Sequence, residues 1–263
     1  MAWLRRHLLA VAALGVLAYL LAPNLVVAAY SFNQPNGRFN YEWGRFSTQA
    51  WTDPCGAPGI CTSLGLSLRI GIVASLVATI LGTLVAFALG RHRFRGRTAT
   101  NLLIFLPMAT PEVVMGSSLL TLFIALGIPT GQVAILIAHI MFCLSFVVVA
   151  VKARISTLDP ALEEAAADLG ATPVQAFVRV TLPLAAPGIA AGALLAFSLS
   201  FDDYIVTNFN ASPSSITFPM YVWGAAQRGT PVQINVIGTV MFLFALLVVL
   251  LGQVLSSRRQ RKA

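Results

Sequence analysis

The sequence predicts an all-α integral membrane protein with six transmembrane helices. Of its 263 residues, 57% are hydrophobic and only 10% are charged, and the mean hydropathy is +0.82. Soluble domains carry about 25% charged residues, so lipid is the expected main solvent of this chain. The chain also contains apolar stretches of about 20 residues, which is the length that a helix needs to cross about 30 Å of hydrocarbon.

Six stretches meet this length, and all of them are expected to be helices. They are Leu8–Tyr30, Leu66–Leu89, Asn101–Leu126, Gln132–Val151, Pro187–Phe209 and Ile234–Leu255. The first could instead be a signal peptide, because Arg5 and Arg6 precede it and Val27-Ala28-Ala29 resembles a cleavage site. Its apolar run is longer than the usual core of about 7–15 residues in a signal peptide, so we expect a retained helix.

The third stretch is interrupted by Pro107, Pro111 and Glu112. A break within the hydrocarbon region leaves backbone groups that only other helices or a watery cavity can satisfy. The third stretch is therefore a candidate for lining a pathway.

Basic residues predict the orientation of the chain. With the N-terminus inside, the inner segments hold Arg5, Arg6, Arg91, Arg93, Arg95, Arg97, Lys152, Arg154, Arg179, Arg258, Arg259, Arg261 and Lys262. The outer segments hold only Arg38, Arg45, Arg69 and Arg228. This bias places both termini in the cytoplasm. The net charge of +8 is explained by these clusters, so nucleic-acid binding is not expected.

We expect a single transmembrane domain over residues 1–263. Residues 1–65 comprise the first helix and a long outer loop, and residues 66–263 form a core with a cytoplasmic loop at 152–186. Cys55 and Cys61 lie in the outer loop, where a disulfide and two free thiols are equally compatible with the sequence. Cys143 lies in an apolar run and is expected to be a small packing residue.

The loop at 152–186 is longer than a helix connection requires, and it contains helix signals. Asp159-Pro160 is typical of an N-cap followed by proline at the first helical position. Ala161, Leu162, Ala165, Ala166 and Leu169 form one small apolar face. Gly170 is placed to end this helix in a left-handed conformation.

A second short helix is expected directly after this corner. Thr172-Pro173-Val174-Gln175 fits a capping box, and Leu182-Pro183 is expected to end the helix. Two capped helices would thus project into the cytoplasm. They either pack passively on the bundle or dock to a partner that passes force to the membrane helices.

The spacing within this loop resembles a known family signature. Glu164-Ala165-Ala166, three residues, Gly170, nine residues and then Val180-Thr181-Leu182-Pro183 is similar to the EAA motif of binding-protein-dependent ABC importer permeases, with Val180 in place of Ile. The resemblance implies a type I ABC importer permease fold in which this segment is a coupling helix. It implies that an ATPase subunit meets Glu163, Glu164, Ala165, Ala166, Asp168, Leu169, Gly170 and Ala171.

The resemblance also implies partners. They are a cytoplasmic ABC ATPase dimer, a second related permease and an extracytoplasmic binding protein, in a bacterial inner membrane. The chain lacks the Gly-x-x-x-x-Gly-Lys-Ser/Thr phosphate loop and has no catalytic constellation, so it is not expected to be an enzyme or to hold a cofactor or metal. Whether the pore is a homodimer or a heterodimer stays open.

Three acids fall within apolar stretches: Glu112, Asp202 and Asp203. An acid costs about 2.5–3.5 kcal/mol at the membrane centre on insertion scales, so such residues are candidates for a functional site. We expect Glu112 about 16 Å and Asp202 about 22 Å from the inner ends of their spans. Together with Phe201 and Tyr204 they suit a cationic solute. Alternatively, the acids are hydrogen-bonded to neighbouring helices. Successive residues point about 100° apart, so only one of Asp202 and Asp203 is expected to face a pathway.

The sequence around these acids resembles that of the second permease of spermidine/putrescine importers. The likeness covers about residues 104–240 and includes Pro111-Glu112-Val113-Val114-Met115 and Leu199-Ser200-Phe201-Asp202-Asp203-Tyr204. It implies a polyamine as the solute, without indicating which one. Permeases for iron and for aminophosphonates share parts of these motifs and remain alternatives, as does an ATP-independent channel or secondary transporter.

Two further features of the apolar stretches are singled out. His139 lies within the fourth stretch, where a buried, neutral histidine hydrogen-bonded to a neighbouring helix is expected. Gly188 and Gly192 form a small-xxx-small motif, which serves close helix packing within this chain or with a partner permease.

Overall fold

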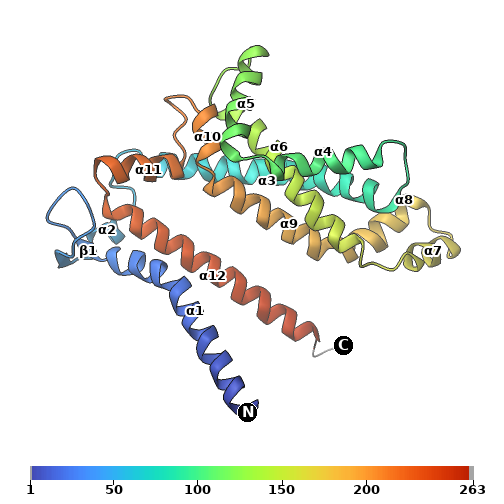
Figure 1. The fold of residues 1–263 in the computed structure, drawn as a ribbon, viewed down its shortest axis with the longest axis horizontal. Coiled ribbons are helices and arrows are strands. Elements are labelled where there is room, and N and C mark those ends of the chain that lie inside the picture. Colours follow the sequence, from blue (N-terminus) through green and yellow to red (C-terminus); the bar gives the residue numbers. More distant parts are fainter. Residues whose placement is uncertain (1, 261–263) are drawn as a thin grey trace. The chain divides into compact units, whose positions relative to one another are not determined.

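The computed structural model describes the backbone of residues 2–260 and the side chains of residues 7–252, and the chain is mainly helical (Figure 1). Within the described residues, five helices are long and apolar enough to cross a membrane, or six if one bent pair counts as a single span. The predicted helical membrane class is therefore confirmed. Arg5, Arg6, Arg258, Arg259, Arg261 and Lys262, which the orientation argument uses, lie outside the residues whose side chains are described.

The chain divides into two compact units. One comprises Met1–Cys61 with Tyr221–Ala263, and the other comprises Thr62–Met220. The first unit thus joins the first helix and outer loop to the last helix, which the expected division at residue 65 did not anticipate. The single transmembrane domain itself stays a prediction.

In the first unit, the N-terminal and C-terminal helices pack along one another (Figure 1). The elements are α1 (Ala2–Tyr30), β1 (Asn33–Gln34), β2 (Arg45–Phe46), α2 (Gln49–Thr52) and α12 (Val232–Gln260). β1 and β2 pair antiparallel, and Cys55 and Cys61 form a disulfide, which decides between the two alternatives left open by the sequence.

The outer loop is a folded structure organised around one amide. The Asn33 side chain donates to Asn40 Oδ1 at 2.7 Å and to the Glu42 carbonyl at 2.8 Å, and it accepts from the Gly44 N–H at 2.9 Å. Only 2% of Asn33 is exposed. Because a buried amide is costly unless it is paired, these three bonds fix the path of the loop.

The second unit holds most of the helices. They are α3 (Ile60–Arg91), α4 (Arg97–Ala109), α5 (Glu112–Ala125), α6 (Gln132–Ile155), α7 (Ala161–Asp168), α8 (Pro173–Ala176), the π-helical turn η1 (Phe177–Thr181), α9 (Leu182–Asp202), α10 (Ile205–Asn210) and α11 (Phe218–Arg228), with α3 beginning and α11 ending in the first unit. Its core lies on α6, where Ala138, Val147 and Val151 are fully buried. α6 packs along α9 (Figure 1).

The break expected in the third stretch is present. α4 and α5 meet at 109° across Thr110 and Pro111. Thr110 has extended backbone, as the residue before a proline prefers, and its N–H closes the last turn of α4 on the Leu106 carbonyl. Pro107, in contrast, lies inside α4 without ending it.

The expected bounds of the fifth span are wrong. The helix runs from Pro173 to Asp202 through the π-helical turn, whereas Pro187–Phe209 was expected. Leu182-Pro183 therefore does not end the second loop helix. Pro183 lies in the first turn of α9, directly after the wider π turn, where its missing N–H costs little. At the other end, the helix stops at Asp202, and residues 205–210 form the separate helix α10.

The two glycines of the small-xxx-small motif face α6 within the same chain. A Cβ on Gly188 would overlap the Arg154 Cβ and lie 2.7 Å from the Arg154 Cγ. A Cβ on Gly192 would lie 3.5 Å from the Ala150 Cβ, which is an ordinary contact. Of the two packing roles considered, the structure therefore uses the motif inside the subunit.

We predict that Gly188→Ala lowers the midpoint of thermal unfolding in detergent, whereas Gly192→Ala leaves it unchanged or raises it. Overpacking a tight contact costs about 1–3 kcal/mol, which exceeds the gain of about 1 kcal/mol from replacing a helical glycine by alanine. At Gly192 only the gain applies. Equal midpoints for the two variants would contradict this packing.

Candidate functional site

The loop between α6 and α9 forms the expected pair of helices. Asp159 Oδ1 accepts from the Ala161 N–H at 3.0 Å at the start of α7, and Gly170 ends it with φ of +82°. Thr172 and Gln175 form the capping box: the Gln175 N–H donates to Thr172 Oγ1 at 3.4 Å, and the Thr172 N–H donates to Gln175 Oε1 at 2.9 Å. We call residues 159–176 the hairpin.

Most residues expected to meet an ATPase lie at the surface of the hairpin. Glu164, Ala165, Asp168, Leu169 and Gly170 are exposed, whereas Glu163, Ala166 and Ala171 are half-buried. Leu169 is 89% exposed at the turn. A large apolar side chain presented at the tip of a polar turn is available to a partner, because nothing in the described residues covers it.

Glu163 has a different environment from Glu164. Its Oε1 lies 3.0 Å from the Arg91 Nε at the end of α3 and accepts a hydrogen bond from Thr181 Oγ1 at 3.1 Å. Arg91 also donates to the Leu158 carbonyl at 3.4 Å. Glu163 therefore fastens the hairpin to α3 and to the π-helical turn, which leaves Glu164 as the outward-facing acid.

A cavity of about 420 Å³ lies beside this fastening. It is lined by Phe87, Arg91 and His92 at the end of α3 and by Glu163, Glu164, Ala167, Ala171, Pro173, Ala176, Phe177 and Thr181. On either side of it, Arg91 of α3 pairs with Glu163 of the hairpin, and Phe87 of α3 packs edge-on against Phe177 of η1.

The three apolar-stretch acids lie at the opposite end of α9 from the hairpin. Glu112 is the first residue of α5 and is exposed, and Asp202 is the last residue of α9 and is exposed. α5 packs against α10, where Gly116 meets Phe209 and Val206, so Glu112 and Asp202 are close enough for their charges to interact. The expected position of Asp202 within its helix is thus wrong, because the helix ends at this residue.

Asp203 differs from its neighbour. Its side chain is only 5% exposed, and its Oδ2 lies 3.3 Å from His139 Nε2 and accepts from the Thr207 N–H at 2.7 Å. Asp203 thus follows the alternative in which an acid bonds to a neighbouring helix. His139 is 1% exposed and hydrogen-bonded, as expected for a structural histidine.

The two aromatic candidates flank these acids. Phe201 is half-buried and stacks on Phe197 with ring centroids 5.9 Å apart. Tyr204 occupies the N-cap position of α10. Both lie at the corner between α9 and α10, beside Asp202.

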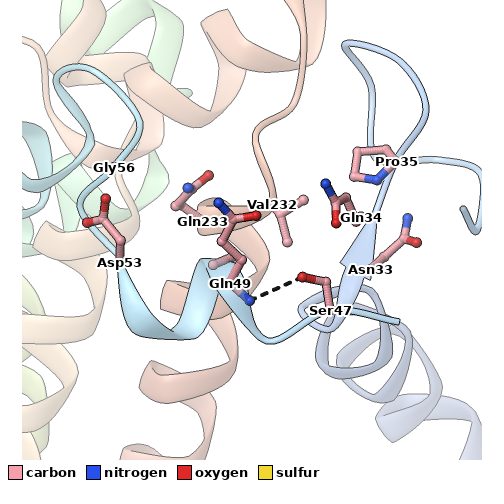
Figure 2. A pocket seen from close by; sticks show the side chains of 10 residues that line it. Asn33, Gln34, Pro35, Ser47, Gln49, Asp53, Gly56, Val232 and Gln233 are labelled. Carbon is pink, nitrogen blue, oxygen red and sulfur yellow. Dashed lines mark hydrogen bonds between the residues drawn. The ribbon is translucent and has the colours of Figure 1, made fainter. Parts of the chain in front are cut away.

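A second cavity lies in the first unit, and Figure 2 shows it from close by. Its volume is about 370 Å³, and its lining mixes polar and apolar residues: Asn33, Gln34, Pro35, Ser47, Gln49, Ala50, Asp53, Gly56, Val232 and Gln233. Ser47 Oγ accepts from the Gln49 N–H at 3.2 Å, which orders the start of α2. Side-chain amides and one carboxylate, Asp53, give this cavity groups that can form hydrogen bonds.

Sequence reasoning missed four residues that build these sites. Arg91 was used only to predict the orientation of the chain, although it pairs with Glu163. Thr181 was named only as part of the EAA motif, although it also donates a hydrogen bond to Glu163. Ser200 and Thr207 both bind His139. The one available indication was spacing, because Thr207 lies four residues after Asp203 and so faces the same side of a helix.

Comparisons with known proteins cover most of the chain. The sequence model of the family described as "Binding-protein-dependent transport system inner membrane component" matches residues 78–262. The spermidine/putrescine transport system permease protein PotC of Escherichia coli (strain K12) is 35% identical over 242 residues, covering 92% of this chain and 91% of that protein. The putrescine transport system permease protein PotI of the same strain is 39% identical over 230 residues, covering 85% and 81%.

Solved structures show the same fold. A bacterial alginate ABC transporter in complex with alginate pentasaccharide-bound periplasmic protein contains a chain that matches with a TM-score of 0.71 at 18% identity, covering 97% of this chain and 94% of that one. A bacterial ABC transporter involved in the import of alginate matches with a TM-score of 0.68 at 19% identity, covering 95% of each chain.

We predict that Glu163→Gln speeds amide hydrogen exchange in the hairpin, whereas Glu164→Gln does not. The amide keeps the shape but loses the charge that holds Arg91, and a partly exposed ion pair contributes at most about 1 kcal/mol, so exchange should rise by up to about fivefold. Mass spectrometry of peptides covering residues 159–176 measures it. Equal exchange in both variants would show that Glu163 does not fasten the hairpin.

Proposed function

The chain belongs to the inner membrane components of binding-protein-dependent transport systems, and we propose that it forms half of the translocation pathway of an ATP-driven importer of polyamines. The hairpin carries the first part of this proposal. It presents Glu164, Leu169 and Gly170 outward, while Glu163 ties it to α3 and to the base of α9. A fastened element with an exposed apolar tip is suited to receive force from a partner.

The partner at the hairpin is a cytoplasmic ABC ATPase dimer. Closure of the ATPases on ATP would move the hairpin, and with it α9, so that the permease switches between outward-open and inward-open states. The proposal thus puts the hairpin on the cytoplasmic side, and with the bent pair of α4 and α5 counted as one of six spans it implies that both termini of the chain are cytoplasmic.

The solute is a small polycation, and spermidine and putrescine fit best. Glu112 and Asp202 are both exposed and lie close to one another, so together they offer two negative charges to a cation that leaves water. Two exposed acids disfavour an anion at the same place. The relatives PotC and PotI are named as permeases of spermidine/putrescine and putrescine transport systems, and both of these solutes are cations.

Two further partners complete the importer. A second related permease would supply the other half of the pathway. An extracytoplasmic polyamine-binding protein would dock on the first unit, where the ordered outer loop and its polar cavity offer amides and the carboxylate of Asp53. The solved alginate transporter that shares this fold was captured with its periplasmic protein.

We predict that Glu164→Lys and Gly170→Arg abolish copurification of the ATPase with the permease from detergent. The first reverses the charge of the outward-facing acid, and the second puts a long side chain where φ is +82°. Glu42→Lys, the same change on the exposed outer loop, is the matched control and should retain the ATPase. If neither the wild-type chain nor any variant copurifies an ATPase, the result would contradict the importer and favour an ATP-independent channel or secondary transporter.

We predict that Glu112→Gln and Asp202→Asn each slow uptake of labelled spermidine and putrescine by the reconstituted complex by about tenfold. Each removes one charged partner of the solute, an interaction of about 1.5 kcal/mol or more. The double variant should transport least, and Glu42→Gln should transport normally. Normal uptake by the double variant would end the cation-pathway hypothesis.

A further inference from the structure

Four polar side chains meet in the core beside the corner between α9 and α10. Ser200 lies before the corner, Asp203 lies at it, Thr207 lies after it, and His139 reaches them from α6. His139, Ser200 and Thr207 are at most 4% exposed, and the Asp203 side chain is 5% exposed. Buried polar groups are costly in a membrane protein, so a cluster of four is expected to have a role.

The side chain of Asp203, the residue before the N-cap Tyr204, accepts hydrogen bonds from the first turn of α10. Its Oδ2 accepts from the Thr207 N–H at 2.7 Å and from Thr207 Oγ1 at 2.8 Å, and its Oδ1 accepts from the Val206 N–H at 3.3 Å. The backbone of Asp203 is extended, with ψ of 124°, which ends α9. The free N–H groups created by this stop are thus satisfied by the side chain of the residue that causes it.

His139 ties both sides of the corner to α6. Its Nδ1 lies 2.7 Å from Ser200 Oγ, and its Nε2 lies 3.0 Å from Thr207 Oγ1. The single hydroxyl hydrogen of Thr207 is directed to Asp203, whose carboxylate and carbonyl are its acceptors. Thr207 therefore accepts from the Nε2–H of His139, while Nδ1 shares the second hydrogen bond of the ring with the Ser200 hydroxyl.

We propose that His139, Asp203 and Thr207 form a positioning lock that holds Asp202 in its exposed orientation. Successive residues of a helix point about 100° apart, so holding Asp203 inward turns Asp202 away from that direction, and Asp202 is exposed. In this arrangement Asp203 is not a ligand of the solute. The inference rests on the proposed function for the role of Asp202, but the geometry of the lock can be tested without transport.

The test measures the accessibility of position 202 in the full chain in membranes with its partners. The background carries Cys143→Ser. This change removes the buried free thiol, and the serine hydroxyl takes its place as donor to the Ala196 carbonyl. In this background, we measure how fast the cysteine of the Asp202→Cys variant reacts with a membrane-impermeant trimethylammonium methanethiosulfonate. We expect His139→Ala to lower this rate by about fivefold or more, because the unlocked corner populates orientations that turn residue 202 inward.

Three variants separate positioning from general stability. His139→Gln keeps a donor and an acceptor and should restore most of the rate. Thr207→Val keeps the shape without the hydroxyl and should lower the rate like His139→Ala, which covers the case that the alanine variant fails to fold. Val147→Ala opens a cavity on the same helix and should lower the unfolding midpoint without changing the rate.

An unchanged or higher rate in both His139→Ala and Thr207→Val would overturn the lock. An equal fall in Val147→Ala would do so too, because the effect would then reflect only a loosened core. Failure of the wild-type complex to take up polyamines would overturn the proposed function instead, and it would leave the labelling result unaffected.

Discussion

A helix that stops inside an apolar environment leaves N–H and C=O groups without partners, and this constraint governs the second unit. The chain stops helices in this way at two neighbouring places, between α4 and α5 and between α9 and α10. At the first, Pro111 has no N–H to satisfy, and the chain turns by 109°. At the second, the carboxylate of Asp203 supplies the missing acceptors. Both solutions place an exposed acid at the break.

The two breaks depend on each other through packing. Gly116 of α5 lies against Phe209 and Val206 of α10, so the start of one broken helix is held by the other. A Cβ at Gly116 would lie 2.8 Å from the Phe209 ring, which allows no larger residue without a shift. The proximity of Glu112 and Asp202 therefore follows from a close helix contact rather than from any attraction between the two acids, whose like charges repel.

The sequence predicted the apolar helices and the hairpin well, because both have strong local patterns. The capping box at Thr172 and the left-handed Gly170 depend only on neighbours, and both are present. The end points of α9 could not be predicted in the same way. Pro183 and Pro187 suggested a boundary, but Pro183 follows a π-helical turn in the first turn of α9, and Pro187 lies inside α9 without ending it.

The candidate site was predicted less completely, since its partners are far apart in sequence. Glu163 and Glu164 are adjacent and identical in the sequence. Their environments differ because Glu163 pairs with Arg91, which lies 72 residues earlier in the chain. In the same way Asp202 and Asp203 are adjacent and identical, and His139 on another helix decides which one is buried. Spacing along one helix can show that two acids point apart, but not which direction is the core.

The continuity of the helix from Pro173 to Asp202 gives the two sites a physical connection. At 1.5 Å per residue its 30 residues span about 45 Å, with the hairpin at one end and the exposed acid at the other. α6 runs beside it and is bound at both ends: Arg154 donates to the Leu184 carbonyl at 3.1 Å near the hairpin, and His139 holds Ser200 near the corner. A packed helix pair can move as one body, and this is the connection between the hairpin and Asp202 that the proposed function requires. Along this path the helix widens to a π-helical turn at η1, where Thr181 donates to Glu163, so the same turn joins the hairpin to α9.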